Sequence, residues 1–147
     1  MIPLLVLIVT FAVLRLAGAL GWEPFDSWHA ALRGALAAMF CLTASAHWGK
    51  RRPDLVRMVP PRFPHPELLV TVTGVLEILG AIGLLIPATA KPAALCLALL
   101  LTALFPANIH AARQHLTIGG RPVPAIPLRT VLQVVFLAAL LAVAWRG

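Results

Sequence analysis

Long apolar segments alternate with shorter, proline-rich polar gaps along the whole chain. Five such segments stand out, at about 2–20, 30–48, 67–86, 92–110 and 128–145. Each is close to the roughly 20 residues with which a helix crosses about 30 Å of hydrocarbon. The segments lack the alternation of a barrel strand, and a single segment in lipid must satisfy its own backbone hydrogen bonds. The pattern predicts an all-α, polytopic membrane helix bundle that forms one transmembrane domain over residues 1–147.

The first segment could also be a signal peptide, because Ala17-Gly18-Ala19 resembles a cleavage site. However, no basic residue precedes its apolar stretch, and Arg15 interrupts that stretch. We therefore expect a membrane helix at 2–20.

The composition supports a membrane protein. Only 12% of the residues are charged and 61% are hydrophobic, whereas a soluble domain carries roughly 25% charged residues. The net charge of +7 could suggest nucleic acid, but such binders gather Lys and Arg on one soluble face. Here the basic residues cluster in the gaps between apolar segments, so we expect a lipid bilayer as partner and no nucleic acid.

The gaps predict the orientation. The gap at 49–66 contains five basic residues: Lys50, Arg51, Arg52, Arg57 and Arg62. The gap at 111–127 and the start of the last segment add Arg113, Arg121 and Arg129. The opposite side has only Lys91 and Arg146. By the positive-inside rule both basic gaps face the cytoplasm, which predicts a cytoplasmic N-terminus and an external C-terminus in a bacterial cytoplasmic membrane.

Tryptophans and prolines support these boundaries. All four tryptophans fall at predicted helix ends, where an aromatic belt would lie: Trp22, Trp28, Trp48 and Trp145. Most prolines lie in the gaps or at segment edges, where a missing N–H is tolerated. The short connection around Pro87 to Pro92 requires antiparallel neighbours, so we expect an up-and-down bundle.

Glu77 is the strongest candidate for chemistry. It lies near the middle of the third segment, where a bare carboxylate would need a partner or a proton. Thr73 lies one turn away on the same face, and nearby glycines would allow close helix approach: Gly74, Gly80 and Gly83. A structural carboxylate that holds the bundle together is an equally good interpretation.

The second segment carries a polar stripe, because Arg33, Phe40 and His47 are spaced by seven residues. His47 would lie at the inner edge, either as an interfacial hydrogen bonder or as a ligand. Arg33 can extend outward to the interface. Arg15 is the better candidate for an ion pair with Glu77, because both would lie deep in the membrane.

A second polar group is predicted near the inner ends of the last two segments: Pro106, Asn108, His110, Arg129 and Gln133. With His47 these residues could line a cytoplasmic vestibule that leads to Glu77. No HxxxH or ExxH spacing supports a metal site. Cys41 and Cys96 would lie at different depths, too far apart for a disulfide.

Three stretches resemble the DoxX family of small bacterial membrane proteins: "LRGALAAMFCLTASAHW" (32–48), "MVPPRFPHPELLVTVTGVLEILGAIGLLIP" (58–87) and "FPANIHAA" (105–112). With "LRTVLQ" (128–133), the likeness covers residues 30–145. It implies a four-helix core with an extra N-terminal helix at 2–20. It also places on family motif positions Arg33, His47, Gly74, Glu77, Pro87, Pro106, Asn108, Arg129 and Gln133.

Two hypotheses on function follow, and they leave open whether the protein is an enzyme. The resemblance implies an accessory subunit of a membrane redox complex, with a redox partner or a second copy of the chain as candidate partner. The alternative is a protein that binds a quinone or lipid, or an enzyme acting on one, with a pocket centred on Glu77. No cofactor motif is evident, although a quinone fits either hypothesis. A proton-coupled transporter is a weaker interpretation because no internal repeat is visible. The basic gap at 49–66 could instead dock an acidic soluble partner.

Overall fold

Helices form most of the molecule in a computed structural model that describes residues 1–145. In chain order its elements are α1 (Ile2–Ala19), the 3-10 helix η1 (Glu23–Phe25), α2 (Trp28–Ser45), α3 (Arg52–Met58), α4 (Pro66–Leu85), α5 (Pro87–Arg113), β1 (Thr117–Ile118), β2 (Arg121–Pro122) and α6 (Ile126–Trp145). All five predicted long helices are confirmed, whereas α3, η1 and the small hairpin β1–β2 were not predicted.

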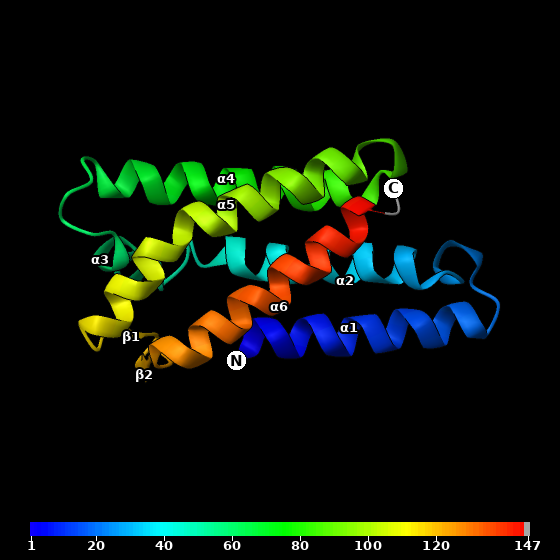
Figure 1. Cartoon of the computed structure of the whole chain (residues 1–147), viewed down its shortest axis with the longest axis horizontal. Coiled ribbons are helices and arrows are strands. Elements are labelled where there is room, and N and C mark those ends of the chain that lie inside the picture. The colour runs from blue at the N-terminus through cyan, green and yellow to red at the C-terminus, as the bar shows by residue number, and fades with distance from the viewer. Residues whose placement is uncertain (146–147) are drawn as a thin grey trace.

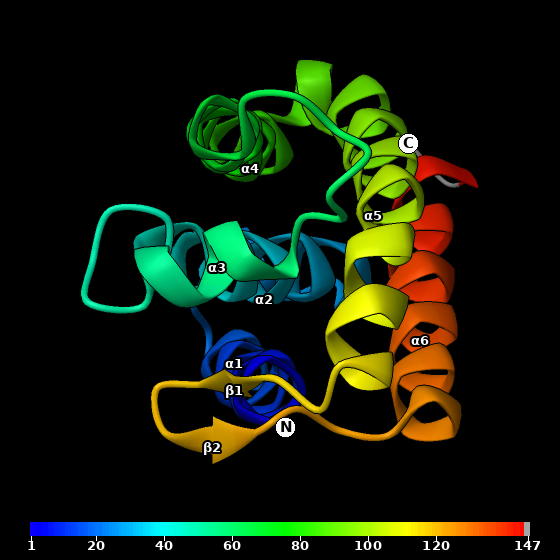
Figure 2. The ribbon, with the colours of Figure 1, turned by 90° about the vertical axis from the view of Figure 1, so that its left-hand side faces the viewer.

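The long helices run antiparallel to their chain neighbours and form two layers (Figure 1). Viewed along the bundle, α1, α2 and α4 form one column, and α5 and α6 lie beside it (Figure 2). The main packing partners are α1 with α2, α2 with α4, α4 with α5, and α5 with α6. The expected up-and-down arrangement is therefore confirmed.

Local chemistry explains where these helices begin. The Ser27 hydroxyl accepts a hydrogen bond from Ala30 N at 3.1 Å and caps α2. Prolines occupy the first turn of α1, α3, α4 and α5, where their missing N–H has no helical partner to lose. Pro87 thereby starts α5 well before the predicted position 92, and Ile86 alone links α4 to α5.

The helix α2 lies at the centre of the bundle. The largest fully buried side chains include its Leu36, Met39 and Phe40, which pack with Leu84 of α4, Leu97 of α5, and Leu140 and Val143 of α6. Within residues 1–145, four helices are long and apolar enough to cross a membrane: α1, α4, α5 and α6. The prediction of five apolar spans is thus met by four, because α2 carries more polar residues, such as His29 and Arg33.

Both basic gaps lie at the same end of the bundle. Asp54 of α3 accepts a hydrogen bond from Gly119 N in the hairpin turn at 2.8 Å, which joins the two gaps directly. Asp54 also pairs with Arg57. The Gly119 N–H, followed by the Arg57 side chain, holds the pKa of Asp54 below its ordinary value of 3.8. Gly119 and Gly120 have φ values of 57° and 75°, which explains why glycines occupy this turn.

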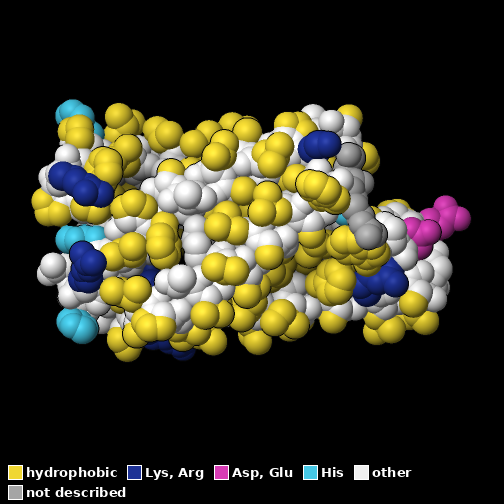
Figure 3. All heavy atoms as spheres, viewed as in Figure 1, with side chains coloured by type: hydrophobic (Ala, Val, Ile, Leu, Met, Phe, Trp, Pro, Cys, Tyr) yellow, Lys and Arg dark blue, Asp and Glu magenta, His cyan; other side chains and the backbone are white. Residues whose placement is uncertain are grey.

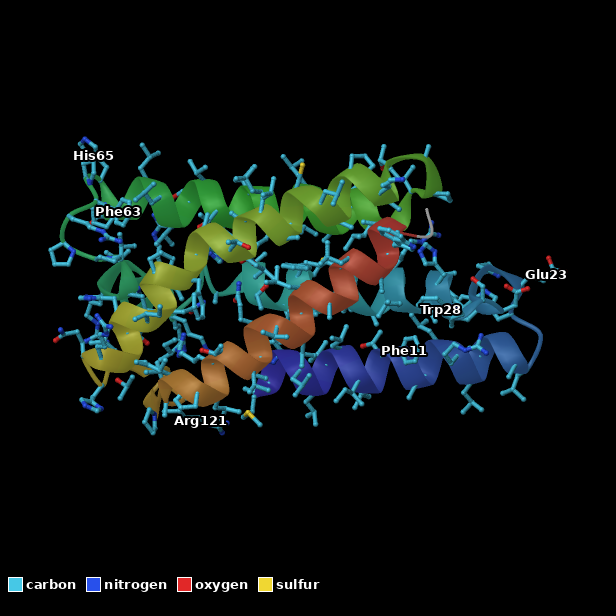
Figure 4. The ribbon with its side chains drawn as sticks, in the orientation of Figure 1. Phe11, Glu23, Trp28, Phe63, His65 and Arg121 are labelled. Carbon is cyan, nitrogen blue, oxygen red and sulfur yellow. The ribbon has the colours of Figure 1, made fainter. Side chains whose placement is uncertain are left out.

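Apolar and charged side chains occupy different parts of the surface. On the face shown in Figure 3, apolar side chains cover the middle of the molecule, and charged and histidine side chains gather mainly towards its ends. Figure 4 shows Phe63, His65 and Arg121 at the end that carries α3 and the hairpin, and Glu23 at the opposite tip. Charge is therefore segregated along the long axis of the bundle.

Candidate functional site

Glu77 lies between α4 and α2 and is only 4% exposed. The Thr43 hydroxyl of α2 donates a hydrogen bond to Glu77 Oε2 at 2.6 Å. Thr73, expected on the same face, instead bonds to the carbonyls of Leu69 and Val70 in its own helix. Glu77 therefore accepts a hydrogen bond that joins two helices, and its partner Thr43 was not predicted.

Small residues on α4 allow this close packing. A Cβ placed on Gly74 would come within 2.7 Å of the His47 side chain, and one on Gly80 within 2.5 Å of Leu97. On Gly83 a Cβ would lie 2.8 Å from Ala93. The expectation that these three glycines permit close helix approach is confirmed.

Arg15 does not pair with Glu77, so that prediction was wrong. Its guanidinium donates to the backbone carbonyls of Phe25, at 3.4 Å, and Asp26. Depth alone was a poor guide, because α1 packs against α2 and η1 and presents Arg15 to the turn that follows α1. Arg15 thus ties α1 to the η1 segment.

His47 follows the end of α2 and is buried, with 7% of its surface exposed. Its Nδ1 lies 3.2 Å from the carbonyls of both Thr43 and Ala44, an arrangement that suits a protonated Nδ1 as donor. Arg52 donates to the His47 carbonyl at 2.7 Å and to the Thr71 hydroxyl at 2.9 Å. Arg52 therefore holds the end of α2 against α4. This role was not predicted, because in the sequence Arg52 is only one of five basic residues in the gap at 49–66.

Arg33 lies half-buried on α2, and its Nε is buried without a hydrogen-bond partner among the described residues. A buried guanidinium N–H that lacks an acceptor is unfavourable. Of the predicted site residues, Arg33 is thus the one whose surroundings leave a polar group unsatisfied.

Asn108, Arg129 and Gln133 do come together, at the interface of α5 and α6. Arg129 donates to Asn108 Oδ1 at 2.5 Å and to the Pro124 carbonyl at 3.3 Å. Gln133 donates to the Leu101 carbonyl of α5 at 2.8 Å. These contacts hold α6 against α5 beside Pro106, which lacks the N–H of an ordinary helix position.

The predicted vestibule is divided among three places. His47 and Glu77 lie along α2 and α4, Asn108 lies with its partners between α5 and α6, and His110 lines a separate surface groove. The surface of residues 1–145 includes two open hollows: that groove, and one of about 400 Å³ between the start of α2 and the end of α6. Glu77 lines neither of them.

The last expectations from the sequence concern metal binding and the two cysteines. Among residues 1–145, no group of three or more His, Cys, Asp or Glu side chains is placed to hold a metal ion. Cys41 and Cys96 are both free and exposed.

Comparison with known protein families shows to which family the chain belongs. Residues 36–146 match the domain of unknown function DUF8561. The chain belongs to the DUF8561 family. The resemblance to DoxX was therefore wrong, and the expectation of a redox partner loses the support that it drew from that resemblance. The DUF8561 match begins within α2 and does not include α1. No curated protein and no solved structure matches the chain.

Proposed function

We propose that the protein is a multi-pass integral membrane protein of the cytoplasmic membrane. The observation that carries this proposal is the exposure of large apolar side chains on the outer helices. Leu5 and Leu16 of α1 are 63% and 62% exposed, Leu79 of α4 is 59% exposed, and Leu99 of α5 is 71% exposed. Apolar faces of this extent are unfavourable in water and favourable in lipid.

In this arrangement α2 is the fifth crossing helix. It is less apolar than the others, but α1, α4 and α6 pack around it. Polar groups inside a membrane bundle are tolerated when they face neighbouring helices. The shielding of α2 supports its membrane position even though its own sequence would be a weak span.

The basic end is proposed to face the cytoplasm. Positive charge near membrane ends is retained on the cytoplasmic side, and the contact between Asp54 and Gly119 places both basic gaps at one end. Labelling with a membrane-impermeant maleimide tests this orientation in a variant without Cys41 and Cys96. In intact spheroplasts, Glu23→Cys should be modified and Gln114→Cys should not. The reverse result would contradict the orientation, and extraction of the protein by alkaline carbonate would contradict membrane insertion.

Within the membrane, an accessory role is the function that the site geometry favours. Several polar side chains of the proposed spanning helices bond to neighbouring helices, as the bonds of Glu77 with Thr43 and of Gln133 with Leu101 illustrate. Such bonds stabilise a bundle. Purification in a mild detergent should yield an assembly heavier than the 15.7 kDa chain. Turnover of a quinone or thiol by the purified chain alone would contradict an accessory role.

A second candidate function is binding of a small molecule within the membrane, and Arg33 favours it. Its buried, unpaired Nε would gain an acceptor from a ligand oxygen. Mass spectrometry of small molecules that copurify with the wild type, Arg33→Gln and Glu77→Gln tests this candidate. A quinone or lipid lost from both variants would support a site extending to Glu77, whereas loss from Arg33→Gln alone would restrict it to Arg33. Identical small molecules in all three would count against the candidate.

A further inference from the structure

An open groove of about 440 Å³ lies at the basic end of the bundle. One wall comes from the connection between α3 and α4, and the other from the last turns of α5. Its lining residues are Pro60, Pro61, Arg62, Pro106, Ile109, His110 and Arg113. Three of the seven are prolines, whose fixed φ angles restrict the backbone of both walls.

The groove is basic. Arg62, His110 and Arg113 line it, and none of its lining residues is acidic. The single ion pair among residues 1–145 joins Arg57 to Asp54, so neither groove arginine has a carboxylate partner. The Arg62 guanidinium carbon lies 5.1 Å from the centre of the Phe63 ring, a contact that leaves its N–H groups available. The groove therefore offers two guanidinium groups to an anion.

The groove lies where headgroups would be. With 27 residues, α5 rises about 40 Å along its axis, more than the roughly 30 Å of a hydrocarbon core. Since α5 begins at Pro87, directly after the turn at the opposite end, its final turns extend beyond the hydrocarbon. His110 and Arg113 belong to the last turn of the helix.

One stripe of α5 connects the groove to the apolar surface. Leu99, Ala103, Pro106, His110 and Arg113 are spaced by three or four residues and therefore share a face of the helix. Leu99 and Ala103 are exposed. The stripe thus changes from apolar to basic over about four turns, or about 21 Å.

We infer that this groove binds an anionic phospholipid of the cytoplasmic leaflet. Its phosphate lies between Arg62 and Arg113, and an acyl chain follows the exposed stripe of α5 past Leu99. Guanidinium groups suit phosphate oxygens through paired hydrogen bonds, and Ile109 with the prolines suits the glycerol region. The inference rests on the proposed membrane position and orientation, and it adds the class of ligand and its site.

The test compares two double variants that lose the same charge from the same end. Arg62→Gln with Arg113→Gln changes the groove, whereas Lys50→Gln with Arg121→Gln changes two exposed basic residues that do not line it. Each protein is titrated in detergent with phosphatidylglycerol or phosphatidylcholine, and bound lipid is counted by native mass spectrometry. Labelling and carbonate extraction of the same variants confirm that they remain inserted and oriented as the wild type is.

The wild type and the Lys50/Arg121 variant should prefer phosphatidylglycerol, and the Arg62/Arg113 variant should lose about tenfold or more of its affinity for that lipid. Equal losses in both variants would indicate general attraction by positive charge and would overturn the inference, as would an unchanged groove variant. Competition by soluble glycerol phosphate as effective as that by the lipid would show a free-phosphate site and overturn the lipid assignment. If the wild type is labelled as expected but does not prefer phosphatidylglycerol, only the lipid site in the groove is refuted. If the protein is not inserted in the membrane, the proposed function is refuted and the inference with it.

Discussion

The neighbouring helices α1 and α2 have the same length of 18 residues but opposite relations to their surroundings. α1 is a candidate membrane span and buries only Leu7 and Gly18. α2 is not among those candidates, yet it buries seven residues, four of them alanines. In a membrane bundle the most apolar surface can face lipid, while small residues allow close packing inside. In the proposed membrane position, hydropathy therefore indicates which helices would face the bilayer, and it says little about which helix forms the core.

The largest test of this contrast is truncation of a core side chain. Phe40 of α2 is 1% exposed, so Phe40→Ala should lower the free energy of unfolding by about 3 kcal/mol or more, because it leaves a cavity. Leu16 of α1 is 62% exposed, and Leu16→Ala should change the free energy of unfolding by less than about 0.5 kcal/mol. Reversible unfolding in mixed micelles measures both. Similar effects in the two helices would refute the contrast.

The two arginines of these helices provide a smaller effect. Arg15→Gln should lower the free energy of unfolding by about 1.5 kcal/mol, because it removes the guanidinium that donates to the carbonyls of Phe25 and Asp26. Arg33→Gln should be close to neutral or stabilising, because its buried Nε has no partner to lose. The same unfolding assay separates the two variants. A cost for Arg33→Gln equal to that of Arg15→Gln would show that Arg33 also has a structural role.

A matched pair of threonines should give a smaller effect still. Thr43→Val removes the hydroxyl that donates to Glu77 and should cost about 1 kcal/mol, a typical scale for a bond between membrane helices. Thr10→Val in α1 should cost less than about 0.5 kcal/mol, because Thr10 makes no hydrogen bond to another helix within residues 1–145. Equal costs would mean that the bond between Thr43 and Glu77 adds no stability.

The smallest effect lies outside both helices, at the contact between α3 and the hairpin. The pKa of Asp54 is lowered in the folded protein. The ionised Asp54 side chain therefore contributes its full stabilisation of the fold well above pH 3.8, and this stabilisation is lost as the pH falls through the lower folded pKa. The Gly119 amide resonance should therefore shift in an NMR titration below about pH 4. In Asp54→Asn this shift should disappear, and persistence of the shift would assign it to another group.

The sequence predicted the long helices well because their signal is local. Runs of apolar residues, with prolines in first turns, mark the ends of α4 and α6 to within a few residues. Pairing across helices was not readable in the same way. Neither the Thr43 bond to Glu77 nor the Arg15 bond to Asp26 leaves a pattern along the chain. Depth along a helix fixes one coordinate of a side chain, and a partner also depends on which face it lies on.

The small elements and the family were missed for related reasons. α3 has only seven residues and each strand of the hairpin has two, so their patterns are too short to stand out from polar gaps. The mistaken DoxX resemblance rested on short matches such as "GLLIP" and "FPAN". Few residue types suit close packing between apolar helices, so such short stretches carry little information about the family.

The one-residue link at Ile86 has a practical consequence for anyone who modifies the chain. Ile86 directly follows the last residue of α4 and directly precedes the first residue of α5, so there is no spare backbone at that end. An epitope inserted there would separate two packed helices. The exposed tip at Gly120 faces open space instead and is the better site for a reporter sequence.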